Sequence, residues 1–254
     1  MQKRFNDLFH QSLGPMRSCT HRFVLIRFGA GILAMSGSIG GVTHARNRSG
    51  AYQRARTKPI NPNTARQIAV RSAVTLLSAR WADTLTSVQR TAWGLYADSI
   101  AMKNKLGETI FLSGFNHYIR SNVILVQSGN TVIDDGPTVF ELPEKDPTMA
   151  ITASEAAQQI SVSFDNTLPW ANETGGFLFT FQGSPQNAQR NFFIGPWRAM
   201  TQIIGDDSIP PTSPSVQPVS FAIAAGQRQW IYARISRLDG RLSERFFADI
   251  FSAA

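Results

Sequence analysis

The chain has 254 residues, 43% of them hydrophobic, which is enough for one large domain or two small ones with a buried core and excludes a wholly disordered protein. Its single cysteine, Cys19, excludes an internal disulfide framework and a structural zinc site. The net charge of +8 is unevenly distributed, because residues 1–130 hold 17 Lys/Arg and 4 Asp/Glu whereas residues 131–254 hold 8 and 13. The two halves, at +13 and −5, are therefore expected to face different partners.

The excess of positive charge is concentrated near the N-terminus. Between Asp7 and Asp83 there are eleven lysines or arginines and no carboxylate. Such a stretch attracts polyanions or acidic protein surfaces, and its self-repulsion opposes compaction. We expect part of it to become ordered only against a partner, which favours a role in assembly over that of a soluble enzyme.

Residues 1–36 are set apart as an N-terminal extension for which two hypotheses stand. The apolar run 23–35 follows a basic region, as the core of a signal peptide does. In the second hypothesis Met35 is the biological start, because the chain changes character there. The run contains Arg27 and is shorter than the roughly 20 apolar residues that a membrane helix needs, so we expect neither a transmembrane span nor a membrane partner.

Residues 37–63 are predicted to form an extended basic arm. Glycines loosen its first part, Pro59 and Pro62 forbid a helix in its last part, and no helical apolar period is visible. Alternating cations would share one side of an extended chain, and these are Arg54, Arg56 and Lys58, with Arg46 and Arg48 as a second pair. The arm is either a solvated loop or a segment that lies across an acidic protein surface or a nucleic-acid backbone.

Residues 64–130 are predicted to form a small domain of about three helices. The first helix, over 64–82, is capped by Asn63 or Thr64 and places four apolar side chains on one face, namely Val70, Val74, Leu77 and Trp81. A Thr86-x-x-Gln89 capping box starts the second helix, which runs to about residue 100. The third helix spans 113–127. We expect Trp81, Trp93 and Tyr118 to pack between these helices rather than to bind a ligand.

An acidic linker, residues 131–147, is predicted to lead into an antiparallel β-sandwich over 148–254. Apolar residues alternate with polar ones, as in strands with one buried face, at 160–164, 177–181 and 219–223. Further strands are expected at 148–153, 191–194, 229–237 and 242–251. About seven short strands without an intervening helix favour a two-sheet sandwich, so the expected class is α+β.

The segment from Trp230 to Ser243 resembles the last hairpin of a fibronectin type III domain, in which an aromatic-bearing strand leads through a Gly-containing turn into the final strand. The resemblance implies a fibronectin III or immunoglobulin-like sandwich and no particular chemistry.

No sequence motif indicates catalytic activity. A phosphate-binding loop, a dinucleotide fingerprint and a Gly-x-Ser-x-Gly elbow are all absent from the sequence. The pairs Asp134-Asp135 and Asp206-Asp207 lie in turn-rich stretches and are interpreted as solvated loop acids rather than as cation sites. We therefore expect no enzyme activity, no cofactor and no metal site.

The run from Gly40 to Thr64 contains a Gly-Gly, an Arg-x-Arg, a Gly-x-Tyr-x-Arg and an Asn-Pro-x-Thr, and a Trp-bearing helix pair with Leu-Thr-x-x-Gln-Arg follows it. In the helix pair the matching positions are Trp81, Leu85, Thr86, Gln89, Arg90 and Trp93. Over about residues 37–125 the chain thereby resembles a group of tailed-phage and prophage virion-associated proteins. The resemblance implies a viral setting.

These patterns lead to the hypothesis of a structural component of a tailed-bacteriophage virion, of the minor capsid or decoration type. Its expected partners are other virion proteins and copies of itself in a symmetric assembly. The expected partner-binding residues are Arg46, Arg48, Tyr52, Arg54, Arg56 and Lys58.

Three alternatives remain: a neck or tail protein, a nucleic-acid-binding protein that uses the same cations, and a fibronectin-like receptor or carbohydrate binder that uses Trp170 and Trp197.

Overall fold

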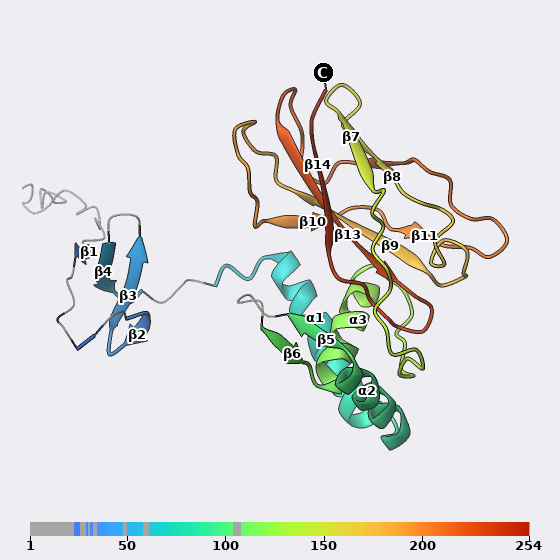
Figure 1. The fold of residues 1–254 in the computed structure, drawn as a ribbon, viewed down its shortest axis with the longest axis horizontal. Helices are drawn as coiled ribbons and strands as arrows, with labels where there is room; N and C mark the ends of the chain where they lie inside the picture. Colours follow the sequence, from blue (N-terminus) through green and yellow to red (C-terminus); the bar gives the residue numbers. More distant parts are fainter. Residues whose placement is uncertain are drawn as a thin grey trace, which may run out of the picture. The chain divides into compact units, whose positions relative to one another are not determined.

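The computed structural model describes residues 23–25, 29, 31–32, 35–47, 50–57, 61–103 and 108–253. The chain divides into two compact units, residues 1–62 and residues 63–254 (Figure 1). The predicted helical segment and the predicted sandwich both belong to the second unit. The main boundary therefore lies at the start of the first helix, and no comparable boundary separates the helices from the sandwich.

The first unit contains an antiparallel sheet with the strand order β1-β4-β3-β2. Its strands are β1 (Phe23–Leu25), β2 (Gly37–Ile39), β3 (Val42–Asn47) and β4 (Gly50–Ala55). The predicted arm is extended, as expected, but it is folded into paired hairpins rather than lying as a single strand. Gly40 and Gly41, at φ values of 56° and 87°, form the two-residue turn between β2 and β3, where positive φ is required at both positions. Because β1 pairs with β4, the sheet also extends across the expected boundary at residue 36.

The helices of the second unit begin where their capping residues predicted. They are α1 (Ala65–Ala79), a π-helical turn η1 (Arg80–Thr84), α2 (Ser87–Ser99) and α3 (Gly114–Gln127). Thr64 and Thr86 each accept a hydrogen bond from the backbone of the glutamine three residues on, and that glutamine's side chain accepts one from the cap backbone. A short hairpin that the sequence did not predict, β5 (Ala101–Lys103) and β6 (Thr109–Phe111), joins α2 to α3.

The aromatic residues of the helices pack against one another, as predicted. Trp93 and Tyr118 are fully buried, with ring centroids 5.7 Å apart in an edge-to-face arrangement. Trp81 is half-buried and lies 5.3 Å from the Tyr118 ring. Along α1 the predicted apolar face is buried at Leu77, whereas Val70 and Val74 remain 41% and 37% exposed. The first half of α1 therefore presents an apolar surface.

The C-terminal part is a two-sheet sandwich with the strand arrangement of a fibronectin type III domain, so the expected α+β class is confirmed. One sheet has the order β12-β8-β7, and its strands are β7 (Ala150–Ser154), β8 (Gln159–Ser163) and β12 (Ser215–Pro218). The other has the order β10-β9-β13-β14, with the strands β9 (Phe177–Gly183), β10 (Trp197–Ala199), β13 (Arg228–Ser236) and β14 (Phe246–Phe251), and β11 (Ile203–Ile204) also pairs with β9. The strands expected at 191–194 and 219–223 lie instead at β10 and β12.

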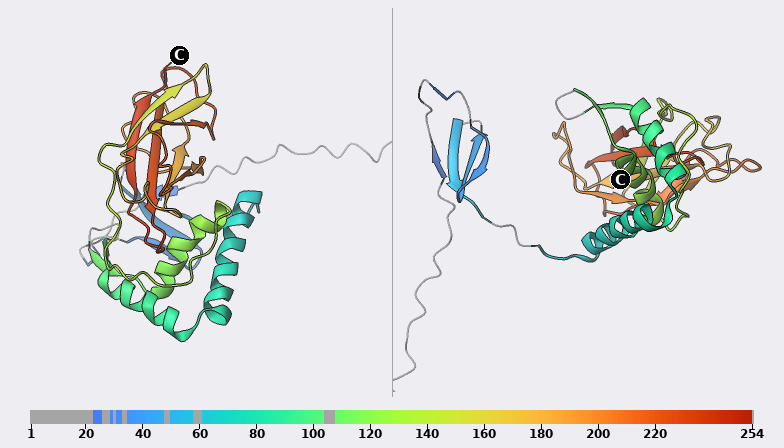
Figure 2. Two further views of the ribbon diagram at one scale, coloured as in Figure 1. Left: turned by 90° about the vertical axis from the view of Figure 1, so that its right-hand side faces the viewer. Right: turned by 90° about the horizontal axis from the view of Figure 1, so that it is seen from below.

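The larger sheet is covered on both faces, which the alternation of apolar residues in β9 does not reveal. Leu178 points into the sandwich core, whereas Phe179 packs against Ile124 and Leu125 of α3. The end of α3 thus packs on the outer face of the larger sheet, and Figure 2 shows the helices together at one end of the sandwich. Arg120 of α3 fixes this stacking, because its guanidinium donates hydrogen bonds to the carbonyl oxygens of Leu242 (2.6 Å) and Ser243 (2.7 Å).

His117 of α3 makes the stability of this stack dependent on pH. The side chain is fully buried, neither ring nitrogen has a hydrogen-bond partner, and burial together with the nearby Arg120 lowers its pKa to about 4. The unfolded chain binds the proton near the ordinary histidine value of 6.5, so stability falls as the pH drops from 6.5 toward 4.

We expect the free energy of unfolding to decrease by about 3 kcal/mol across that window, as measured by urea denaturation at a series of pH values. A His117→Phe variant should lose most of this slope. Equal slopes in the two proteins would contradict the assignment.

Candidate binding surface on the basic N-terminal sheet

The strand register assigns the side chains of the N-terminal sheet to its two faces, because directly paired residues point to the same side. Thr43 pairs with Arg54 and Ala45 with Tyr52, so these four share one face. Two cross-strand contacts agree with the register. The hydroxyl oxygens of Ser38 and Thr43 lie 2.7 Å apart on this face, and Gln53 Nε2 lies 3.2 Å from His44 Nδ1 on the other.

The register divides the predicted partner-binding residues between the two faces. Tyr52 and Arg54 lie on one face, and the backbone pairing continues to Arg56, whose N–H donates to the Gly41 carbonyl, so alternation places Arg56 on the same face. Arg46 pairs with Ala51 on the opposite face. All three of these arginines are exposed, and Tyr52 is half-buried. Arg48 and Lys58 lie outside the described residues.

Among the residues of this unit whose burial the structure describes (29, 31–32, 35–46, 50–57 and 61–62), no side chain is buried. A small antiparallel sheet needs an apolar face that is packed against something in order to be stable. Ile39, for example, is 73% exposed at the end of β2. The side chains of β2, and those of β3 and β4 whose burial the structure describes, therefore form no buried apolar face.

The boundary between the two units separates the net charge of the chain more completely than the division into residues 1–130 and 131–254 does. Residues 1–62 hold 10 Lys/Arg and one Asp/Glu, whereas residues 63–254 hold 15 and 16. The first unit thus carries +9 and the second −1, so the entire positive excess belongs to the N-terminal unit. A surface of this kind can bind anionic surfaces through many weak contacts.

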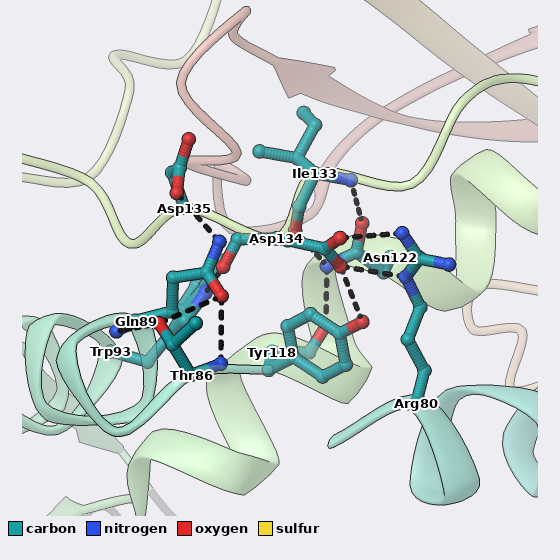
Figure 3. Close-up of polar contacts among 9 residues, drawn as sticks. All are labelled: Arg80, Thr86, Gln89, Trp93, Tyr118, Asn122, Ile133, Asp134 and Asp135. Atoms are coloured by element: carbon teal, nitrogen blue, oxygen red, sulfur yellow. Dashed lines mark hydrogen bonds and ion pairs between the residues drawn. The ribbon is translucent and has the colours of Figure 1, made fainter. Parts of the chain in front are cut away.

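Asp134 is a structural anchor rather than a solvated loop acid (Figure 3). Its carboxylate accepts hydrogen bonds from Arg80, including one of 2.7 Å from Nε, and from the Tyr118 hydroxyl at 3.1 Å. The hydrogen bonds from Arg80 hold the pKa of Asp134 below its usual range. The Trp93 indole N–H donates to the Asp134 carbonyl at 2.9 Å. The predicted acidic linker, residues 131–147, is therefore bound to the helices at its start, and we call this segment the strap.

The described part of the chain offers no cluster of metal ligands. No group of three or more His, Cys, Asp or Glu side chains there is arranged to hold a metal ion. Asp206 accepts hydrogen bonds from the backbone N–H groups of Ser208 and Ile209 and so stabilises its own turn. No helix in the described ranges has the length and apolarity required to cross a bilayer.

The two tryptophans considered for carbohydrate binding have different environments. Trp170 is 1% exposed within the sandwich core, so it is not accessible to a ligand, and this part of the interpretation is wrong. Trp197 is half-buried on the outer face of the larger sheet, where its indole N–H donates to the Ile194 carbonyl. It packs edge-to-face against Phe193 and Tyr232 in an aromatic cluster that strand alternation alone did not reveal.

Comparisons with known proteins give structural likenesses alone. No protein-family model and no curated protein sequence matches the chain. An Fn3-like protein from Clostridium thermocellum is similar at 9% identity and a TM-score of 0.28, over 45% of this chain and 97% of that one. A family 76 glycoside hydrolase from a bovine Bacteroides thetaiotaomicron strain is similar at 15% identity and a TM-score of 0.27, over 44% of this chain and 21% of that one. Neither likeness bears on function.

Proposed function

We propose that the protein is a structural component of a tailed-bacteriophage virion, of the minor capsid or decoration type, whose basic N-terminal sheet binds acidic surfaces of neighbouring subunits. The observation that carries the proposal is the separation of charge between a small unit of +9 and a larger folded unit of −1. The first unit would attach the protein to neighbouring subunits, and the second would be the folded part that is attached. The viral setting rests on the resemblance of residues 37–125 to phage proteins.

An acidic protein surface is favoured over nucleic acid as the partner. Phe23 of β1 and Tyr52 of β4 are the aromatic residues in the described strands of the sheet, whereas proteins that bind single strands combine cations with several stacking aromatics. The near-neutral second unit adds no net attraction for phosphates. In a particle, many identical copies would add their weak contacts by avidity.

The nucleic-acid alternative is favoured by one observation, that Arg46 and Arg54 present exposed positive charge on both faces of the sheet. Neutralisation of phosphates would make binding weaken steeply with salt and disappear after nuclease treatment.

The proposal is tested by mass spectrometry of phage particles that have been washed with salt and treated with nuclease. Hundreds of copies relative to the major shell protein would support a capsid-wide decoration role. About a dozen copies would assign the protein to the neck or tail, as rings of small copy number do. Absence of the protein from such particles would overturn the proposal and favour nucleic-acid binding.

A further inference from the structure

A groove of about 510 Å³ runs between the first half of α1, the end of α3 and the end of β10. This volume is within the range of roughly 300–1,000 Å³ that is typical of sites holding small ligands or several side chains. Its lining includes Val70 and Leu76 of α1, which are 41% and 52% exposed, together with Val126 and Ala199. The groove is therefore an apolar surface that the described chain leaves uncovered.

Positive charge gathers along one wall of this groove. Arg66 belongs to the lining itself. Ala199 pairs with Phe181, whose ring is stacked on Tyr232 with centroids 4.5 Å apart. The Arg245 guanidinium carbon lies 4.8 Å from the centre of the Tyr232 ring. The charges of Arg66 and Arg245 both act on the Tyr232 hydroxyl, so the cation of the groove lining and the one just before β14 lie near the same side chain.

Another cation lies farther along the same strand. Arg234, two residues beyond Tyr232 in β13, has a buried Nε atom without a hydrogen-bond partner among the described residues. Burial, together with the nearby Arg120 and Arg245, lowers the pKa of Arg234 to about 10. Glu244 is the acid that acts on this group, and its carboxylate lies 2.6 Å from Lys145 Nζ. A carboxylate placed beside Arg66 in the groove would form a charge-assisted hydrogen bond with its guanidinium.

The charge of the groove selects among possible occupants. The Arg66 side chain in the lining favours an occupant that carries a carboxylate. The strap carries a matching segment, because Val139 and Phe140 are 43% and 47% exposed and the exposed Glu141 follows them.

The segment 139–141 is flanked by contacts that order it in the single chain, before any binding. Leu142 packs into the helical core, and Arg241 Nη1 donates to the Glu141 carbonyl at 3.4 Å. A segment that is already ordered loses little conformational entropy on binding.

We propose that the groove receives residues 139–141 of a second copy of the chain, with Phe140 among the apolar side chains of α1 and the Glu141 carboxylate toward Arg66 and Arg245. The strap meets the turn η1 at Arg80, which pairs with Asp134, whereas the groove lining on α1 runs from Arg66 to Leu76. The contact is therefore between two different surfaces, and contacts of that kind build closed rings or open helical arrays. The inference goes beyond the proposed function and depends on neither the basic sheet nor the viral setting.

The experiment is analytical ultracentrifugation of the purified full chain over a series of concentrations. The wild-type protein should self-associate, and Phe140→Asp should weaken association about tenfold or more, because it replaces a buried aromatic anchor with a charge. Ile209→Asp alters a side chain that is 80% exposed elsewhere and should leave association unchanged. Circular dichroism of each variant verifies that it is folded.

A charge exchange tests the register of the contact. Arg66→Glu and Glu141→Lys should each weaken association, and the double variant that carries both should regain most of it, since opposite charges face each other again. A wild-type protein that stays monomeric would overturn the proposal. Association of the Phe140→Asp variant at the wild-type level, or failure of the double variant to recover, would do the same.

Discussion

Reversing the charge of Arg54 and Arg56 together, by substitution with glutamate, is expected to reduce incorporation of the protein into particles by at least about tenfold. Both cations lie beside Tyr52 on one face of the N-terminal sheet, and each reversal replaces attraction to an acidic surface with repulsion. The measurement is the copy number of the variant in washed particles, determined by mass spectrometry against the major shell protein.

Arg46 supplies a matched control, because it is an exposed arginine of the same sheet on the opposite face. Arg46→Glu changes the net charge as much as the single variant Arg54→Glu does. We expect Arg54→Glu to lower incorporation more than Arg46→Glu does. Equal losses would mean that the net charge of the unit, rather than one face, is recognised, and unchanged incorporation of the double variant would contradict the anchor model.

The elements that the sequence predicted well are those set by local chemistry. Thr64 and Thr86 start their helices because each side chain satisfies an N–H group that the helix leaves unpaired, and this requires residues no more than three positions away. The strands of the sandwich were recognisable for the same reason, since alternation is a property of consecutive residues.

The elements that were missed depend on partners distant in the sequence. The Gly40-Gly41 pair was interpreted as a loosened arm, although two glycines between short β-forming runs are also the signature of a tight hairpin. Val70 and Val74 lie on the predicted apolar face of α1 and yet remain exposed, because periodicity shows only that a helix face is apolar and not what covers it. Arg46 and Arg54 lie on opposite faces of the sheet because of the register between β3 and β4. The spacing of residues along one strand does not reveal that register.

Trp93→Ala is expected to lower the free energy of unfolding by about 3–5 kcal/mol, the usual cost of removing a fully buried large aromatic side chain. The indole packs against Tyr96 and Tyr118, and its N–H bond to the Asp134 carbonyl is lost as well. The measurement is urea denaturation of the full chain, followed by circular dichroism. Trp93→Phe keeps a ring in the core but removes the hydrogen bond, so it should cost less than the alanine variant.

The position of Trp93 also predicts how the layers of the second unit separate. A Cβ atom on Gly136 of the strap would lie 2.6 Å from the Trp93 backbone nitrogen, and one on Gly240, in the turn after β13, would lie 3.2 Å from its ring. The Trp93 side chain thus lies where α2, the strap and the turn after β13 meet. Its removal should weaken the packing between the helices and the sandwich. We expect the helical signal of Trp93→Ala to be lost at lower urea than the near-ultraviolet signal of the sandwich aromatics, whereas both are lost together in the wild-type protein. Coincident transitions in the variant would mean that Arg120 and the hydrophobic contacts of α3 suffice to hold the layers together.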